Sequence, residues 1–136
     1  MENLKEQLVR HEGLKLTVYD CPAGYQTIGV GRNLEGKGIT EEEAFYLLNN
    51  DIDYFTEQLK NNIDWFDEIP EEKQNVLINM AFNLGVSGLL NFKNMLLAVK
   101  EERWIDASTE MLDSKWAKQV GNRAIELSGI MANALS

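Results

Sequence analysis

The sequence predicts an α+β fold with a small β-sheet near the N-terminus, a long acidic helix and a helical C-terminal half. Three observations support this class. Residues 14–19 alternate apolar and polar side chains, which is the period of a half-buried strand. Residues 40–60 place apolar side chains at helical spacing behind a Thr-Glu-Glu-Glu start. From residue 67 onward the helical spacing returns, and glycines break it into several short helices.

The N-terminal elements are expected to be a short helix and a β-hairpin. Asn3 and Glu6 have the spacing of a capping box, which starts a helix, and Gly13 is a natural stop for that helix. Strands are predicted at residues 14–19 and 25–30. Between them lies a turn punctuated by Pro and Gly, Asp20-Cys21-Pro22-Ala23-Gly24.

The later elements follow from a loop at residues 33–39 and a second capping box at Thr40 and Glu43. This box starts the long helix, which is expected to end near Lys60. The acidic side chains of the helix should be mostly exposed: Glu41, Glu42, Glu43, Asp53 and Glu57. The core of the helical half is predicted to contain Leu77, Ile78, Ala81, Trp104 and Trp116.

Length and composition narrow the possible classes of protein. The chain of 136 residues and 15.5 kDa is long enough for a single domain or two small lobes that share a core. A single cysteine and a single histidine exclude an internal disulfide and argue against a metal site, so neither a metal nor another cofactor is expected. No apolar run approaches the roughly 18 residues of a membrane span. The start lacks the basic and apolar regions of a signal peptide, which predicts synthesis in the cytoplasm.

The charge of the chain argues against nucleic acid as a partner. The net charge is −9, with 22 acidic and 13 basic residues, whereas nucleic-acid binding depends on lysine and arginine. Twelve of the acidic residues lie in residues 33–72, and the two flanking segments are nearly neutral. The charge of these two segments therefore does not argue against binding of a neutral or anionic ligand.

Three side chains near the N-terminus are candidates for chemistry. Glu12 is expected at the end of the first helix, where the negative pole favours the protonated form that a general acid needs, although most glutamates in this position are simply solvated. Cys21 lies in the turn, and Thr27 lies on the second strand; a lone cysteine is usually a small buried hydrophobe. If the hairpin folds over the helix end, an acid, a thiol and a hydroxyl surround one space where a water could be held.

The residues around these positions resemble the phage-type lysozymes. The active-site pattern of that family is Glu, eight residues, Asp or Cys, five residues, Thr, and Glu12, Cys21 and Thr27 have this spacing. The similarity continues through nearly the whole chain. It includes the segments Gly38-Ile39-Thr40-Glu41-Glu42-Glu43-Ala44, Leu77-Ile78-Asn79-Met80-Ala81-Phe82-Asn83-Leu84-Gly85 and Asn122-Arg123-Ala124.

The resemblance implies a lysozyme-like fold in one catalytic domain, residues 1–136. A small N-terminal β-hairpin lobe would be joined by the long helix to a helical C-terminal lobe. The lobes would cover roughly residues 13–60 and 61–136, and the helix of residues 1–12 would pack on the C-terminal lobe.

The resemblance also implies a muramidase that acts on peptidoglycan glycan strands. Glu12 would protonate the leaving oxygen of the β-1,4 bond between N-acetylmuramic acid and N-acetylglucosamine. Thr27 and Cys21 would place a water on the opposite face, which inverts the configuration. Asp20 is an alternative helper because it directly precedes Cys21.

Other positions match supporting residues of the family. Arg123 matches an arginine that pairs with the catalytic glutamate, and Phe82 matches a residue of the cleft, whereas Met95 and Glu110 stand at two further cleft positions and differ from the family. The family's histidine after the second strand is Arg32 here, which implies an ion pair between Arg32 and Asp51.

Three functions are weighed. The first is a monomeric endolysin used for host cell lysis, made in the host cytoplasm and acting in the periplasm after a separate membrane-permeabilising partner lets it through. The second is a lytic transglycosylase, which also needs one acidic glutamate. The third is a non-catalytic wall-binding or tail-associated domain, in which Glu12 or Thr27 would be expected to be lost; both are present.

Overall fold

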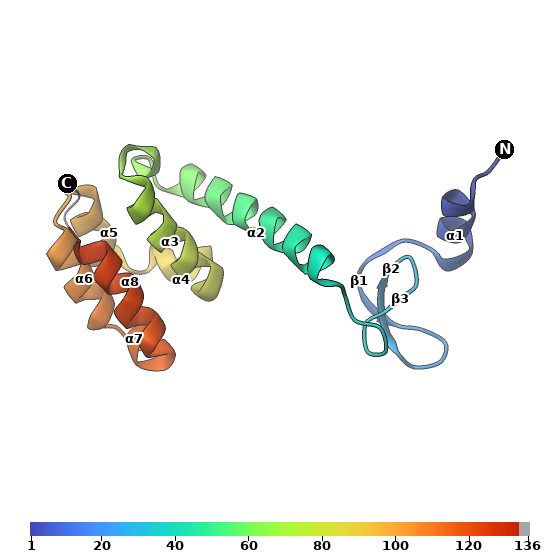
Figure 1. Cartoon of the computed structure of the whole chain (residues 1–136). Coiled ribbons are helices and arrows are strands. Elements are labelled where there is room, and N and C mark those ends of the chain that lie inside the picture. The colour runs from blue at the N-terminus through green and yellow to red at the C-terminus, as the bar shows by residue number, and fades with distance from the viewer. Residues whose placement is uncertain (134–136) are drawn as a thin grey trace. The chain divides into compact units, whose positions relative to one another are not determined.

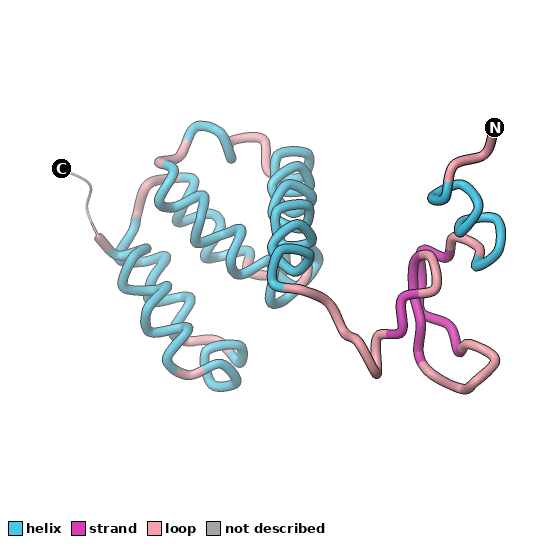
Figure 2. Tube along the Cα trace, turned by 45° about the vertical axis from the view of Figure 1, so that its right-hand side comes forward, coloured by secondary structure: helices cyan, strands magenta, loops and turns pink. Residues whose placement is uncertain are grey.

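The computed structural model describes residues 1–133, and the chain divides into two compact units, residues 1–47 and 48–136. Each unit is described by itself. Within the described residues the strands lie in the first unit, and the second unit is built from helices (Figure 2). The α+β class expected from the sequence is confirmed.

The N-terminal unit contains a short helix and a three-stranded antiparallel sheet (Figure 1). Its elements are α1 (Leu4–Glu12), β1 (Lys15–Asp20), β2 (Gln26–Gly29) and β3 (Arg32–Asn33), with strand order β1-β2-β3. The short strand β3 was expected as the start of a loop. At the start of α1, the backbone N–H of Glu6 donates to Asn3 Oδ1 at 2.8 Å, which confirms the predicted cap.

The sheet of this unit is more exposed than its alternating sequence predicts. Leu14, Leu16 and Val18 are 58%, 83% and 49% exposed, so the prediction of a half-buried strand is wrong for the structure of this unit. The reason is that residues 1–47 supply no second layer over these side chains. Thr27 is the only buried residue in this range.

The helix α2 (Glu41–Asn62) begins at the second predicted capping box. The backbone N–H of Glu43 donates to Thr40 Oγ1 at 3.0 Å, and the backbone N–H of Thr40 donates to Glu43 Oε1 at 2.9 Å. Both halves of the box are therefore formed. Four of the five acidic side chains expected to be exposed are exposed, and the fifth, Glu43, is partly covered.

The C-terminal unit is built from short helices. Its further elements are η1 (Phe66–Glu68), α3 (Glu71–Leu84), α4 (Val86–Leu90), α5 (Lys93–Lys100), α6 (Trp104–Leu112), α7 (Lys115–Val120) and α8 (Asn122–Ala132). Among them, α8 packs against α3, α6 and α7. Leu77, Ala81 and Trp116 are buried as predicted, while Ile78 and Trp104 are partly buried and pack against the same core. None of the described helices is both long enough and apolar enough to span a membrane.

A buried lysine ties α3 to the end of α8. Lys73 is fully buried, and its Nζ donates to the carbonyl oxygens of Ile130 and Asn133, both at 2.6 Å. The ammonium group also lies 5.2 Å from the centre of the Trp104 ring. Burial lowers the pKa of Lys73, and the two carbonyls at the negative end of α8 accept from two of its three N–H donors.

The C-terminal end of α5 forms a Schellman motif around a glutamate. The backbone N–H of Glu102 donates to Val99 O at 3.0 Å, and that of Arg103 donates to Ala98 O at 2.8 Å. Glu102 has φ 59°, a left-handed conformation that glycine usually provides. The sequence gives no signal for this turn because the glycine is missing.

Replacing Glu102 with glycine is therefore expected to raise the free energy of unfolding by up to about 1 kcal/mol. Glycine removes the backbone strain of the left-handed conformation in the folded state. Its larger conformational entropy in the unfolded chain offsets part of this stabilisation. Urea unfolding followed by circular dichroism measures it. Glu101→Gly is the matched control, because Glu101 has an ordinary φ of −89° and the same change there should destabilise. Equal effects of the two variants would contradict the strain argument.

Candidate active site

The turn between β1 and β2 brings Cys21 to the base of the second strand. The backbone N–H of Cys21 donates to Tyr25 O at 2.9 Å, and that of Gly24 donates to Cys21 O at 2.8 Å. Gly24 has φ 88°, which a side chain would disfavour. The predicted Pro and Gly turn is thus a closed, hydrogen-bonded turn that fixes the backbone of Cys21.

Thr27 is held rigidly on β2. Its side chain is 2% exposed, and its hydroxyl donates to the carbonyl oxygen of Tyr25 at 2.9 Å. Because the hydroxyl proton is used in this bond, the lone pairs of Oγ1 are left to accept a hydrogen bond. A water that donates to Thr27 Oγ1 would keep the lone pairs of its own oxygen available.

Cys21 and Thr27 are linked through one carbonyl group, because the backbone N–H of Cys21 and the hydroxyl of Thr27 both donate to Tyr25 O. The pKa of Cys21 is lowered, first by hydrogen bonding to the backbone of Tyr25, and to a smaller extent by the backbone of Ala23 and Gly24 and by the Thr27 hydroxyl. The free thiol is partly exposed. The shared Tyr25 carbonyl therefore ties the backbone of Cys21 to the side chain of Thr27, and a role of the thiol beside Thr27 stays a prediction.

The carboxylate of Glu12 lies against the backbone that follows β2. Glu12 is the last residue of α1, and Gly13 closes that helix by donating its N–H to Val9 O at 2.8 Å. A Cβ built on Gly31 would lie 3.0 Å from Glu12 Oε2 and 3.2 Å from Glu12 Cδ. A side chain at Gly31 would therefore require the end of the Glu12 side chain to shift by a few tenths of an ångström.

Asp20 is placed differently from Cys21. The register of the hairpin pairs Tyr19 with Thr27 and Asp20 with Gln26. Neighbouring residues of a strand point to opposite faces, so Asp20 belongs to the face of the sheet opposite Thr27. This register favours Cys21 over Asp20 as the neighbour of Thr27.

Two further site residues of the sequence lie in the C-terminal unit. Arg123 donates to Asn79 Oδ1 from Nε at 3.0 Å and from Nη2 at 2.8 Å. Phe82 is 41% exposed, and its ring centre lies 5.4 Å from that of Phe55. Phe82 and Asn79 line the same cavity of about 280 Å³. The pairing of Arg123 with Glu12 stays a prediction.

A larger groove of about 470 Å³ lies elsewhere in the C-terminal unit. Met95 and Glu110, the two positions that depart from the family's cleft residues, both line it. Trp116 also lines the groove, and its Nε1 donates to Asn83 Oδ1 at 2.7 Å. No local signal in the sequence connects Asn79 and Asn83 with the site, although their spacing of four residues places them on one face of α3.

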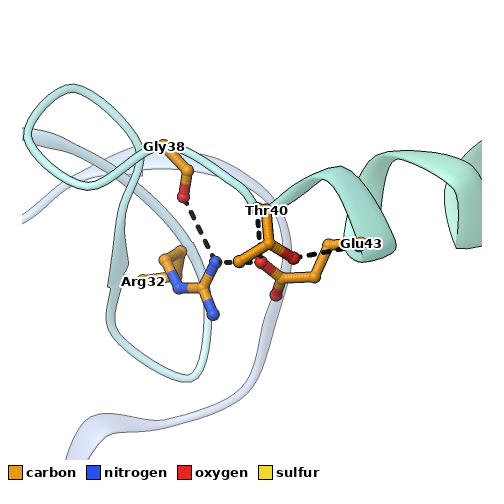
Figure 3. Close-up of polar contacts among 4 residues, drawn as sticks. All are labelled: Arg32, Gly38, Thr40 and Glu43. Carbon is orange, nitrogen blue, oxygen red and sulfur yellow. Dashed lines mark hydrogen bonds and ion pairs between the residues drawn. The ribbon is translucent and has the colours of Figure 1, made fainter.

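Arg32 has a different partner from the one expected. Its Nη1 donates to Glu43 Oε1 at 2.7 Å and to the carbonyl oxygen of Gly38 at 3.2 Å (Figure 3). Glu43 is in the first turn of α2, eight residues before Asp51, and so the expected pair with Asp51 is replaced by one with Glu43. The pKa of Glu43 falls to about 2, chiefly because of Arg32 and then of the Thr40 backbone.

Comparison with known proteins identifies the family. A family model described as phage lysozyme matches residues 9–133. The chain belongs to the phage lysozyme family. Within the described residues, no cluster of three or more His, Cys, Asp or Glu side chains has an arrangement suited to a metal ion.

The relatives of this phage lysozyme family member include proteins that are 25–31% identical to it. It is 28% identical to probable T4-type lysozyme 1 of Dictyostelium discoideum, over 91% of this chain and 90% of the relative. It is 30% identical to an endolysin of Acyrthosiphon pisum secondary endosymbiont phage 1, over 90% and 83%. The pre-baseplate central spike protein Gp5 of Enterobacteria phage T4 is 31% identical over 95% of this chain, which spans 27% of that longer protein.

Proposed function

We propose that this chain is an inverting muramidase that cleaves the β-1,4 bond between N-acetylmuramic acid and N-acetylglucosamine in peptidoglycan, for host cell lysis. One observation carries the proposal. In the N-terminal unit the Glu12 side chain lies beside Gly31, and the backbone N–H of Cys21 and the hydroxyl of Thr27 both donate to the carbonyl oxygen of Tyr25. These are the groups that the family pattern requires.

The proposed reaction is a single displacement. Glu12 donates its proton to the glycosidic oxygen as the bond from that oxygen to C1 of the muramic acid breaks. A water that donates a hydrogen bond to Thr27 Oγ1 forms the new bond to C1 from the opposite face. The second proton of this water passes to solvent, or to the Cys21 sulfur when that sulfur is a thiolate, and the sugar leaves with inverted configuration.

Supporting roles are assigned to the C-terminal unit. Asn79 holds the guanidinium of Arg123 by two hydrogen bonds to one oxygen, and the family resemblance is what assigns this arginine the role of partner to the catalytic glutamate. Phe82 supplies an exposed ring on which a sugar can pack. The chain acts as a monomer in the periplasm, and a separate membrane-permeabilising protein allows it to leave the cytoplasm.

The test is the product formed from purified peptidoglycan. A muramidase releases muramic acid with a free reducing end, and proton NMR of the first product should show the α anomer, inverted from the β bond. A product with 1,6-anhydro ends would instead identify a lytic transglycosylase. Retained configuration would exclude the single displacement.

A second candidate, a tail-associated domain, is favoured by the similarity to the spike protein Gp5. A domain that only binds would sediment with peptidoglycan and release no reducing ends. Release of reducing ends by the isolated chain would leave the muramidase proposal standing for this domain, whether it acts alone or as part of a larger assembly.

The role of Cys21 leads to a prediction. If the thiol only fills space and orients water, Cys21→Ser should keep activity within about tenfold of the unchanged chain, and Cys21→Asp should equal or exceed it. Turbidity loss of cell walls measures both variants. If the thiolate is essential, Cys21→Ser abolishes activity, and alkylation of the thiol removes activity with the pH dependence of thiolate formation.

A further inference from the structure

The geometry points to Arg32 as a positioning residue for the catalytic acid: we propose that it fixes Gly31, and through Gly31 the carboxylate of Glu12. This inference rests on the proposed function, because it assumes that Glu12 is the acid. Arg32 does not touch Glu12. It acts through the backbone of its neighbour, on which the carboxylate rests.

The first step is the contact between Glu12 and Gly31. A Cβ at Gly31 would come within 3.0 Å of Oε2, 3.2 Å of Cδ and 3.3 Å of Cγ of Glu12. All three atoms belong to the end of the Glu12 side chain, so the carboxylate packs directly on the Gly31 backbone. A shift of the Gly31 backbone would therefore change the position of the Glu12 carboxylate that contacts it.

The second step is that Gly31 needs an external constraint. It lies in the connection between β2 and β3, with φ 67°, and Gly29, the last residue of β2, has φ 71°. Glycines have wide backbone freedom, so a turn with two of them is not fixed by its own sequence. The nearest pairing across this turn is between Ile28 and Arg32.

The third step is the rigidity of the Arg32 anchor. Glu43 Oε1 accepts from Arg32 Nη1 at 2.7 Å and from the Thr40 backbone N–H at 2.9 Å. The backbone of Glu43 is in turn fixed by its bond to Thr40 Oγ1. Arg32 is therefore attached to the capped first turn of α2, and Figure 3 shows the guanidinium reaching this cap and the Gly38 carbonyl together.

The anchor is also insensitive to pH. The folded pKa of Glu43 is about 2, which is below its ordinary value, and an arginine stays charged throughout. A carboxyl group with a lowered folded pKa stabilises the fold above its ordinary pKa and loses this effect only as the pH falls toward the lowered value. The pair with Glu43 is therefore complete at neutral pH, where it is net neutral and acts on Glu12 by geometry.

The test measures kcat and KM on soluble glycan fragments for Arg32→Ala, Arg32→Lys and Gly31→Ala. We expect Arg32→Ala to lower kcat by about 10–100-fold with KM changed less than about twofold, since misplacement of a catalytic group by about 1 Å can have this effect. Arg32→Lys should restore part of kcat, because lysine can still pair with Glu43 but has no planar fork. The double variant Arg32→Ala with Gly31→Ala should be less than additive, since both changes act on one contact.

The control is Arg103→Ala. Arg103 is an exposed arginine that pairs with Glu101 and Asp106 at 2.8 Å each, and its loss should leave kcat unchanged. Circular dichroism at the assay temperature gives the folded fraction of each variant. A loss of kcat in Arg32→Ala that equals the loss of folded protein, or full additivity with Gly31→Ala, would overturn the proposal.

A readout without substrate separates this inference from the proposed function. The ¹³C resonance of the Glu12 carboxyl group should move in Arg32→Ala and remain in place in Arg103→Ala. An unmoved resonance overturns the positioning role, whatever the activity. An unchanged chain that releases no reducing ends from peptidoglycan overturns the function instead.

Discussion

Glu12→Gln is expected to lower the rate of wall hydrolysis by about 10²–10⁴-fold, the usual contribution of a general acid. Glutamine has the shape of glutamate but carries no acidic proton, so the glycosidic oxygen would leave without protonation. Glu12 is exposed at the end of α1, and the fold should therefore be unaffected within about 0.5 kcal/mol. Turbidity loss of cell walls and release of reducing ends measure the rate.

The matched control is Glu57→Gln. Glu57 is an exposed glutamate on α2, and the same change of charge there should leave the rate within about twofold of the unchanged chain. Lysis by a folded Glu12→Gln variant at the original rate would refute the assignment of the acid. Equal losses in both variants would indicate an effect of net charge on wall binding instead.

Leu77→Ala is expected to lower the free energy of unfolding by about 2–5 kcal/mol. Leu77 is fully buried in α3, next to the buried side chains of Met80 and Ala81. Truncation removes apolar contacts and leaves a cavity that the surrounding helices fill only in part. Urea unfolding followed by far-ultraviolet circular dichroism reports this loss, because helices dominate the signal.

Ile125→Ala is the control for this prediction. Ile125 lies on α8 and is 63% exposed, so its truncation should change the free energy of unfolding by no more than about 0.5 kcal/mol. The urea concentration at the midpoint of unfolding should therefore be clearly lower for Leu77→Ala than for Ile125→Ala, while the slope of the free energy against urea concentration stays similar. Similar destabilisation by both changes would mean that the core is not centred on α3.

Local signals in the sequence were reliable because their partners are a few residues apart. The capping boxes at Asn3 and Thr40 both form, since each needs only the backbone of the same turn. The Schellman motif at Glu102 could not be predicted, because a glutamate there gives no sign of a left-handed turn. A cap or a turn could therefore be predicted only where it contains the residue type that usually forms it.

Contacts between elements were harder to predict. Alternation in β1 predicted a buried face, but it contains no information about which layer covers that face, and Leu16 is 83% exposed. The partner of Arg32 depended on which of several carboxylates on α2 came within reach, and Glu43 was already fixed nearby by its cap. Glu12, Cys21 and Thr27 were predicted as site residues because their spacing matches the active-site pattern of a known family. That pattern reflects which residues meet in the folded protein, which composition does not.

The buried amine of Lys73 has a consequence for anything joined to the C-terminal end of α8. Because Nζ holds the carbonyl of Asn133 as well as that of Ile130, the backbone is anchored one residue beyond the helix. A label, tag or fused domain attached after Asn133 would be joined to this fixed backbone. Its motion would therefore not be transmitted to the buried core. Because Lys73 belongs to α3, the same hydrogen bonds fix the end of α8 relative to α3, and with it the direction in which an attached group would leave the unit.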